Sequence, residues 1–254
     1  MPHQPYRRDV PGGKNAVLFL HGIVGTPDHF LPLLPLLPED CACVSLLLAG
    51  HGGSARDFAK ASMAQWKDQV ESALADLRAR YENVVIAGHS MGCLLAVRAA
   101  LADPHGLRAL FLLAPPLRIG FQPCAMRASI RVGLDCIPES DEASHWAREA
   151  CSIAPDRFLP VYLGWIPKYL QLFALSREVR KNIGRLSVPV TALFSEKDEM
   201  VDSARSQEQL RRCPLAETET LPESTHFHYP PGDLERLKSR FAEVLHKAGF
   251  SGND

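Results

Sequence analysis

Five short runs of the chain are almost continuously apolar, and amphipathic stretches separate them. The runs cover residues 15–22, 41–50, 83–90, 109–116 and 188–195. Strands that are buried on both faces of a parallel sheet have this pattern, because neither face meets water. Residues 217–224 form a weaker sixth strand prediction, which rests on their alternation and on their position before the last predicted helix.

The stretches between these runs carry the periodicity of amphipathic helices. Ser62 can cap a helix with Gln65 at its third position, and the apolar residues that follow fall on one face: Met63, Trp66, Val70, Ala73, Leu74 and Leu77. A last helix begins after Pro231 and has a similar apolar face, formed by Leu234, Leu237, Phe241, Val244 and Leu245. Alternating strands and helices predict an α/β fold, with a mainly parallel sheet and helices on both faces.

An insertion of about 70 residues interrupts this alternation. It covers residues 118–187, so we predict a helical cap there and a core domain formed by 1–117 and 188–254. Its aromatic residues either hold the cap on the sheet or line a ligand pocket. Ligand sites of open sheets lie beyond the carboxyl ends of the strands, which is where such a cap would sit. Trp165 and Tyr169 are therefore candidate substrate-binding residues.

Residues 158–175 of the insertion are apolar enough to be considered as a membrane span. Lys168 lies near the middle of this stretch, and Pro160 and Pro167 would break helical hydrogen bonds that hydrocarbon cannot replace. The sequence therefore predicts helices that cover the sheet, and no membrane span.

Composition narrows the possible partners. The chain has 254 residues, of which 46% are hydrophobic and 22% are charged, and this is typical of one globular domain. A net charge of −1 and dispersed Lys and Arg argue against nucleic acid as a partner. The first residues lack the apolar segment of a signal peptide, and the seven cysteines are scattered without metal-ligand spacing. We expect a cytoplasmic protein without metal or cofactor, and the oligomeric state stays open.

Ser90 stands between the apolar run 83–90 and a stretch of good helix formers. Gly88 and Gly92 flank it in the pattern Gly-x-Ser-x-Gly, which allows a tight turn that exposes a serine hydroxyl at the start of a helix. The alternative is an ordinary serine where a strand turns into a helix. A nucleophilic serine also needs a base, an acid that orients the base, and N–H donors for the oxyanion.

The base and the acid are expected in loops later in the chain. His226 and His228 lie between the last strand and the last helix, and we favour His226 because this loop should reach its tip soon after Ser224. Four carboxylates follow the run 188–195: Glu196, Asp198, Glu199 and Asp202. We favour Asp198, which lies one short turn beyond the strand. The order serine, aspartate, histidine is the one that this architecture uses.

Two glycine-containing loops follow strands at the same edge of the sheet. Residues 20–26 contain Ile23, whose N–H, together with that of Met91, would bind the oxyanion. Residues 49–54 either line the site or form a plain glycine-rich turn.

Several motifs together resemble the α/β-hydrolase superfamily, and most closely its carboxylesterase and monoacylglycerol-lipase-like branch. They are "LFLHGIVGT", "LLAGHGGS", "VIAGHSMG", "FSEKDEMVD" and "STHFHYP", in the order of the chain. The resemblance implies Ser90 as nucleophile, Asp198 as acid, His226 as base, and the amides of Ile23 and Met91 as the oxyanion hole. Only 14 residues precede the first predicted strand, too few for the family's usual two leading strands in full.

The resemblance also implies an activity. It predicts a hydrolase that cleaves small-molecule carboxylic esters of small or medium acyl chains through an acyl-enzyme intermediate. A thioesterase or carbon–carbon bond hydrolase of the same fold is the alternative enzyme class. A small-molecule receptor without catalytic activity is the alternative outside enzymes, because the fold alone does not determine function.

Overall fold

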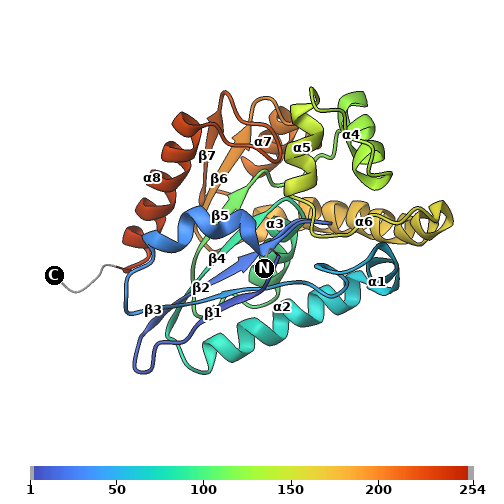
Figure 1. The fold of residues 1–254 in the computed structure, drawn as a ribbon. Helices are drawn as coiled ribbons and strands as arrows, with labels where there is room; N and C mark the ends of the chain where they lie inside the picture. The colour runs from blue at the N-terminus through green and yellow to red at the C-terminus, as the bar shows by residue number, and fades with distance from the viewer. Residues whose placement is uncertain (1–2, 251–254) are drawn as a thin grey trace.

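The computed structural model describes residues 3–250, and a seven-stranded sheet lies at its centre (Figure 1). The strand order is β1-β3-β2-β4-β5-β6-β7, and all neighbouring strands are parallel except β1 and β3. The strands are β1 (Tyr6–Arg8), β2 (Asn15–Leu20), β3 (Cys41–Ser45), β4 (Asn83–His89), β5 (Leu107–Leu113), β6 (Val190–Ser195) and β7 (Ala216–Leu221). This mainly parallel sheet confirms the predicted fold class.

Helices cover both faces of the sheet. The α-helices are α1 (Ala55–Lys60), α2 (Met63–Arg78), α3 (Met91–Ala102), α4 (Pro123–Gly133), α5 (Glu142–Glu149), α6 (Ile166–Asn182), α7 (Ser203–Leu210) and α8 (Pro231–Lys247). The 3-10 helices are η1 (Pro27–Leu36), η2 (Leu159–Trp165) and η3 (Ile183–Arg185). On one face α8 and η1 pack together, and on the other α3 packs against α2 and α6.

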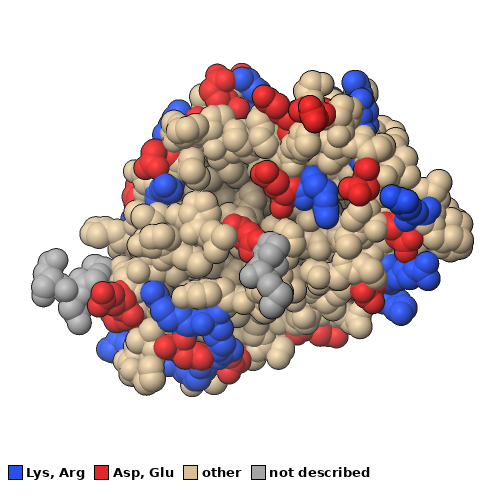
Figure 2. All heavy atoms as spheres, viewed as in Figure 1, with Lys and Arg blue, Asp and Glu red and all other residues tan. Residues whose placement is uncertain are grey.

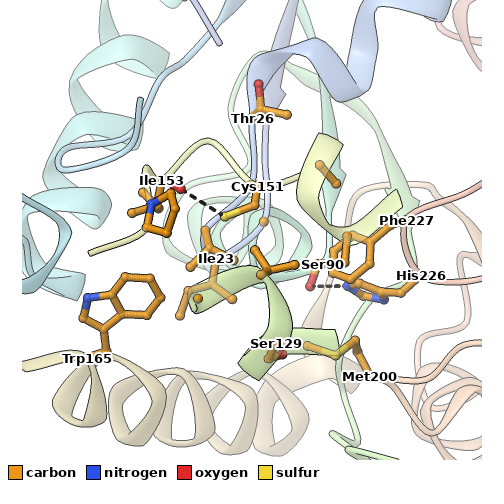
Figure 3. A pocket seen from close by; sticks show the side chains of 18 of the residues that line it. Ile23, Thr26, Ser90, Ser129, Cys151, Ile153, Trp165, Met200, His226 and Phe227 are labelled. Carbon is orange, nitrogen blue, oxygen red and sulfur yellow. Dashed lines mark hydrogen bonds between the residues drawn. The ribbon is translucent and has the colours of Figure 1, made fainter. Parts of the chain in front are cut away.

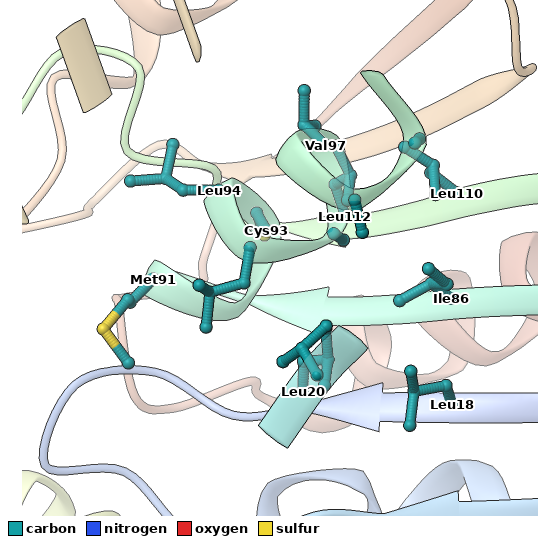
Figure 4. Close-up of a cluster of buried hydrophobic side chains, with 14 of the residues drawn as sticks. Leu18, Leu20, Ile86, Met91, Cys93, Leu94, Val97, Leu110 and Leu112 are labelled. Atoms are coloured by element: carbon teal, nitrogen blue, oxygen red, sulfur yellow. The ribbon is translucent and has the colours of Figure 1, made fainter. Parts of the chain in front are cut away.

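The two faces of the sheet are buried in two separate hydrophobic clusters. In β2, Ala16, Leu18 and Leu20 belong to the cluster under α2 and α3, whereas Val17 and Phe19 belong to the cluster under η1 and α8. Figure 4 shows the first cluster, where side chains of α3 lie over β2, β4 and β5. Since successive side chains of a strand point to opposite faces, burial on both sides explains the continuous apolar runs.

The observed strands differ from the predicted ones mainly at their ends. The run 41–50 is a strand only as far as Ser45, because the chain then turns and the Leu48 N–H donates to the His21 ring (N···N 3.0 Å). The short strand β1 is absent from the sequence prediction; it has three residues, two of them exposed, and pairs antiparallel with β3. Within residues 3–250, one short strand precedes β2, where the family resemblance implies two.

The predicted helices are present. Ser62 caps α2, and its Oγ accepts the Gln65 N–H (3.2 Å), as expected. The apolar stretch 158–175 forms η2 and the first part of α6, and within residues 3–250 no helix is long and apolar enough to cross a membrane.

The insertion 118–187 divides into two kinds of helix. In Figure 1 α4 and α5 stand beyond the ends of the strands, whereas α6 runs beside α3. The buried face of α6, formed by Leu172, Leu175 and Val179, joins the hydrophobic cluster under α2 and α3. The division of the chain into core and cap stays a prediction.

Candidate active site

The chain turns sharply at Ser90, between β4 and α3. Ser90 has φ 51° and ψ −120°, a conformation that non-glycine residues rarely adopt and that is typical of functional sites. A Cβ on Gly92 would lie 1.9 Å from the Leu20 carbonyl oxygen, and a Cβ on Gly88 would lie 2.7 Å from the Cys93 nitrogen. The two glycines are therefore required because backbone passes too close for any side chain.

We expect Gly92→Ala to destabilise the protein, because neither the Leu20 carbonyl nor the helix can move away without disturbing β2 or α3. The free energy of unfolding, measured by urea denaturation, should fall by ~1–3 kcal/mol. Gly232→Ala in α8 is the matched control, since a Cβ at this position would meet no neighbouring atom within 4 Å. Equal stability of the two variants would contradict the close approach at the turn.

Ser90, His226 and Asp198 form one hydrogen-bonded chain at the carboxyl edge of the sheet. Figure 3 shows the hydrogen bond between Ser90 and His226. The His226 Nε2 lies 3.1 Å from the Ser90 Oγ, and its Nδ1 lies 2.9 Å from the Asp198 Oδ2. Asp198 follows β6, and its Oδ1 also accepts the N–H groups of Met200 and Val201 at 2.8 Å. The side chains of Ser90, His226 and Asp198 are all buried, so bulk water does not compete for these hydrogen bonds.

Burial and the neighbouring carboxylates act on the pKa of His226 in opposite directions. Burial lowers the pKa of His226, but the charge of Asp198 and its hydrogen bond, together with the charge of Glu199, outweigh burial and raise the pKa above its ordinary value. A carboxylate at Nδ1 favours the tautomer that carries its proton there, which leaves Nε2 free to accept the Ser90 hydroxyl proton.

The residues that compete with Asp198 and His226 in the sequence lie elsewhere. The His228 ring stacks on Trp146 of α5, with ring centroids 4.0 Å apart and the planes 5° apart. Glu196 is exposed, and Asp202 caps α7 by accepting the Arg205 N–H (3.0 Å). Glu199 accepts the main-chain N–H of His226. The structure therefore brings together the side chains of Asp198, His226 and Ser90, and not those of their competitors.

The amides of Ile23 and Met91 are both available beside Ser90. The loop after β2 passes so close that a Cβ on Gly22 would lie 3.0 Å from the Ser90 Cβ, and the Gly25 N–H closes it onto the Gly22 carbonyl (3.0 Å). Within residues 3–250, neither the Ile23 nor the Met91 amide donates a hydrogen bond to the protein. Met91 is also the first residue of α3, where the helix dipole favours negative charge.

The glycine-rich loop 49–54 does not line the cavity above Ser90. Its Gly53 carbonyl accepts the Ala154 N–H (2.8 Å), and its His51 packs against the His21 ring. It therefore behaves as a turn that supports the loop after β2 and the segment after α5.

A cavity of about 460 Å³ opens above Ser90, between the sheet edge and the helices of the insertion. Trp165 and Tyr169 line it, and their role in substrate binding stays a prediction. Trp165 is also held in place, because its Nε1 donates to the Ala55 carbonyl (3.0 Å). Burial raises the pKa of Tyr169 to about 12, so its phenol stays neutral. No Lys, Arg, Asp or Glu is among the described residues that line this cavity.

Sequence reasoning missed several residues of the cavity wall. His29 and Phe227 lie near His226, while α4 and α5 contribute Val132 and Ala147. The His29 ring stacks on His89 (centroids 3.8 Å apart), and burial lowers its pKa to about 3, so it is neutral. The apolar spacing of residues 130 and 134, at the end of α4, is a sequence signal that could have found this wall.

Parts of the chain are similar to curated proteins. It is 34% identical over 110 residues to the dihydrolipoyllysine-residue acetyltransferase component of the acetoin cleaving system of Cupriavidus necator, which covers 43% of this chain and 28% of that protein. It is 32% identical over 94 residues to a thermostable monoacylglycerol lipase of a Bacillus species, 37% of each chain. The matches thus span only about a third of these relatives.

Comparisons over the whole chain agree on the fold. A solved structure described under LipS and LipT, two metagenome-derived lipolytic enzymes, superposes with a TM-score of 0.73 and covers 96% of this chain and 98% of that one. The sequences are 19% identical, so this likeness speaks for the fold alone. A family model described as "Alpha/beta hydrolase family" matches residues 17–236. The chain therefore belongs to the α/β-hydrolase family.

Proposed function

We propose that this protein is a serine hydrolase that cleaves carboxylic esters of small or medium acyl chains. The observation that carries the proposal is the hydrogen-bonded chain from Ser90 through His226 to Asp198, at the floor of an uncharged cavity. A nucleophile, a base and an orienting acid in this order are the parts that acyl transfer requires.

In the proposed reaction, the Ser90 Oγ attacks the ester carbonyl carbon while the His226 Nε2 takes its proton. Asp198 holds the Nδ1–H tautomer and stabilises the imidazolium that forms. The N–H groups of Ile23 and Met91 donate to the carbonyl oxygen as it becomes an oxyanion. The C–O bond to the alcohol then breaks, the alcohol leaves with the proton of His226, and the acyl group remains on Ser90. Water then attacks the acyl carbon while the His226 Nε2 takes one of its protons. The bond between this carbon and the Ser90 Oγ breaks, the carboxylic acid leaves, and Ser90 regains the proton from His226.

The cavity wall supports a neutral, apolar acyl group, because a charged group would lose its hydration there without a partner. The partial similarity to a monoacylglycerol lipase also favours an apolar ester. A thioesterase acting on a phosphopantetheine carrier would be expected to have a basic entrance. On the face that Figure 2 shows, Lys and Arg lie beside Asp and Glu, without a large basic region.

A panel of p-nitrophenyl esters and acyl-thioesters of equal chain length tests the proposal directly. We expect kcat/KM to be higher for the oxygen esters. Faster turnover of thioesters would support the thioesterase alternative. Binding of esters without turnover would reject hydrolysis and support the receptor alternative.

We expect ester hydrolysis to improve with acyl-chain length until the cavity is full, and to fall for longer chains. Each added methylene that is buried contributes ~0.8 kcal/mol, or about a fourfold gain in kcat/KM. Trp165→Ala and Tyr169→Ala should move the optimum, because both side chains line the cavity. The measurement is kcat/KM for C2 to C16 p-nitrophenyl esters.

Phe173→Ala is the matched control for this series. Phe173 is an aromatic residue of α6, as Tyr169 is, but it is exposed and contacts Phe121 instead of the cavity. It should leave the chain-length optimum unchanged. If Trp165→Ala and Tyr169→Ala lower the melting temperature without moving the optimum, their role is to hold the insertion on the sheet. The hypothesis that they bind the acyl chain is then wrong.

We propose the insertion 118–187 as the cap over this site, since its elements α4, α5 and η2 supply much of the cavity wall.

A cytoplasmic location is supported by the seven cysteines, all of which are free thiols.

A further inference from the structure

Two consecutive carboxylates hold two different parts of His226. Asp198 contacts the ring at Nδ1 (2.9 Å to Oδ2), and the Oε2 of the next residue, Glu199, accepts the main-chain N–H of His226 (3.1 Å). Glu199 is partly buried, and it comes from the loop after β6, whereas His226 comes from the loop after β7. The ring and the backbone of His226 are thus fixed by the same short segment.

This segment is itself fixed from a third direction. The main-chain N–H of Gln122 donates to the Glu199 carbonyl (2.9 Å), and the Gln122 Nε2 donates to the Asp198 carbonyl (3.1 Å). Gln122 directly precedes α4, so the start of the insertion clamps the loop that carries both carboxylates. Glu199 therefore holds His226 from a backbone that has little freedom to move.

Glu199 also adds charge beside His226. Burial raises the pKa of Glu199, whereas the His226 N–H and the charge of an imidazolium favour its ionised form. Three further titratable side chains near His226 are neutral. Burial lowers the pKa values of His29 and of His89, whose Nε2 lies 3.1 Å from the His226 carbonyl, and burial raises the pKa of Tyr229. Asp198 and Glu199 are therefore the negative charges that stabilise protonated His226.

We propose that Glu199 is a positioning residue for His226, which holds the main chain of the base and stabilises its imidazolium by charge. This inference rests on the proposed hydrolysis, in which His226 is the base. Glu199 has no contact with Ser90 and is given no chemical step of its own. Its effect should therefore appear in kcat and in the pH dependence, and not in KM.

The test compares Glu199→Gln, Glu199→Ala and the exposed control Glu196→Gln. Glutamine keeps an acceptor for the His226 N–H but removes the charge, so the pKa of His226 falls. Because the free enzyme is active with neutral His226, activity rises as pH rises through this pKa. The acid limb of kcat/KM should therefore move to lower pH, by roughly half a unit to one unit, with kcat reduced roughly three- to tenfold.

Glu199→Ala removes both the charge and the acceptor and leaves the N–H of His226 without its partner. We expect kcat to fall further, roughly ten- to a hundredfold below wild type, with KM unchanged. Glu196→Gln should match wild type in both kcat and pH profile, because its side chain is exposed. If Glu199→Gln is more active than Glu199→Ala, this difference reports the hydrogen bond to the His226 N–H. The loss that remains between Glu199→Gln and wild type reports the charge.

A readout without turnover keeps this inference distinct from the proposed function. In the Ser90→Ala background, the His226 ring can be titrated by NMR with and without Glu199→Gln. We expect the substitution to lower the titration midpoint, and this would support the role of Glu199 even if wild type hydrolysed no ester. An unchanged midpoint, or a pH profile of Glu199→Gln equal to that of Glu196→Gln, would overturn the inference while leaving the triad in place.

Discussion

Replacing Ser90 by alanine should reduce kcat for ester hydrolysis by roughly 10⁴- to 10⁶-fold and leave the protein folded. The Ser90 Oγ is the atom that His226 contacts at the floor of the cavity, so its loss removes the nucleophile. Alanine keeps the Cβ and fits the same turn, and the fold should therefore survive. The measurements are kcat for a p-nitrophenyl ester and the melting temperature.

Ser129→Ala is the matched control for this prediction. Ser129 also lines the cavity, but its Oγ donates to the Ala125 carbonyl (2.9 Å) and does not contact His226. We expect activity near that of wild type. Ser90→Ala with activity similar to Ser129→Ala would show that the turn at Ser90 is structural.

Replacing His226 or Asp198 should also lower kcat by several orders of magnitude. His226→Ala removes the base, and Asp198→Asn replaces the carboxylate that sets its tautomer, so each should lower kcat by roughly 10⁴-fold or more. The hydrogen bonds of 2.9 and 3.1 Å at the two ring nitrogens of His226 are the physical reason. Steady-state kinetics at saturating ester give the values.

The neighbouring residues provide the controls for these two substitutions. His228→Ala should keep most activity, because the His228 ring contacts Trp146 and not Ser90. Glu196→Gln should leave kcat unchanged. Asp202→Asn should keep activity and lose at most ~1 kcal/mol of stability, since Asp202 caps α7. If His228→Ala were worse than His226→Ala, or Asp202→Asn worse than Asp198→Asn, the corresponding assignment would be wrong.

The sheet could be predicted from the sequence because its strands are buried on both faces. The alternation in β2, with Leu18 in one cluster and Phe19 in the other, leaves no polar position after Asn15 to obscure the strand. Strand ends were less predictable, since the apolar residues 46–48 continue the pattern of β3 after the chain has turned toward His21. The strand β1 carries no apolar signal, because it lies at the edge of the sheet.

The positions of Ser90, Asp198 and His226 could be predicted because the carboxyl ends of parallel strands meet at one edge. The short distance of Asp198 from the end of β6 favours it over its three neighbours, but which carboxylate contacts the His226 ring and which contacts its backbone depends on the path of the loop. The hydrogen bond from His226 to Glu199 is one consequence of that path. The apolar spacing of residues 130 and 134 indicates an apolar face at the end of α4, but what that face covers depends on how the insertion folds back onto the core.

The central claim is that Ser90 is an activated nucleophile, and covalent labelling with a fluorophosphonate tests it most directly. The reagent reacts with the protein, and mass spectrometry of its peptides identifies the modified residue. We expect a single adduct on Ser90 that is lost in Ser90→Ala and kept in Ser129→Ala. An adduct on another residue, or undiminished labelling of Ser90→Ala, would contradict the claim.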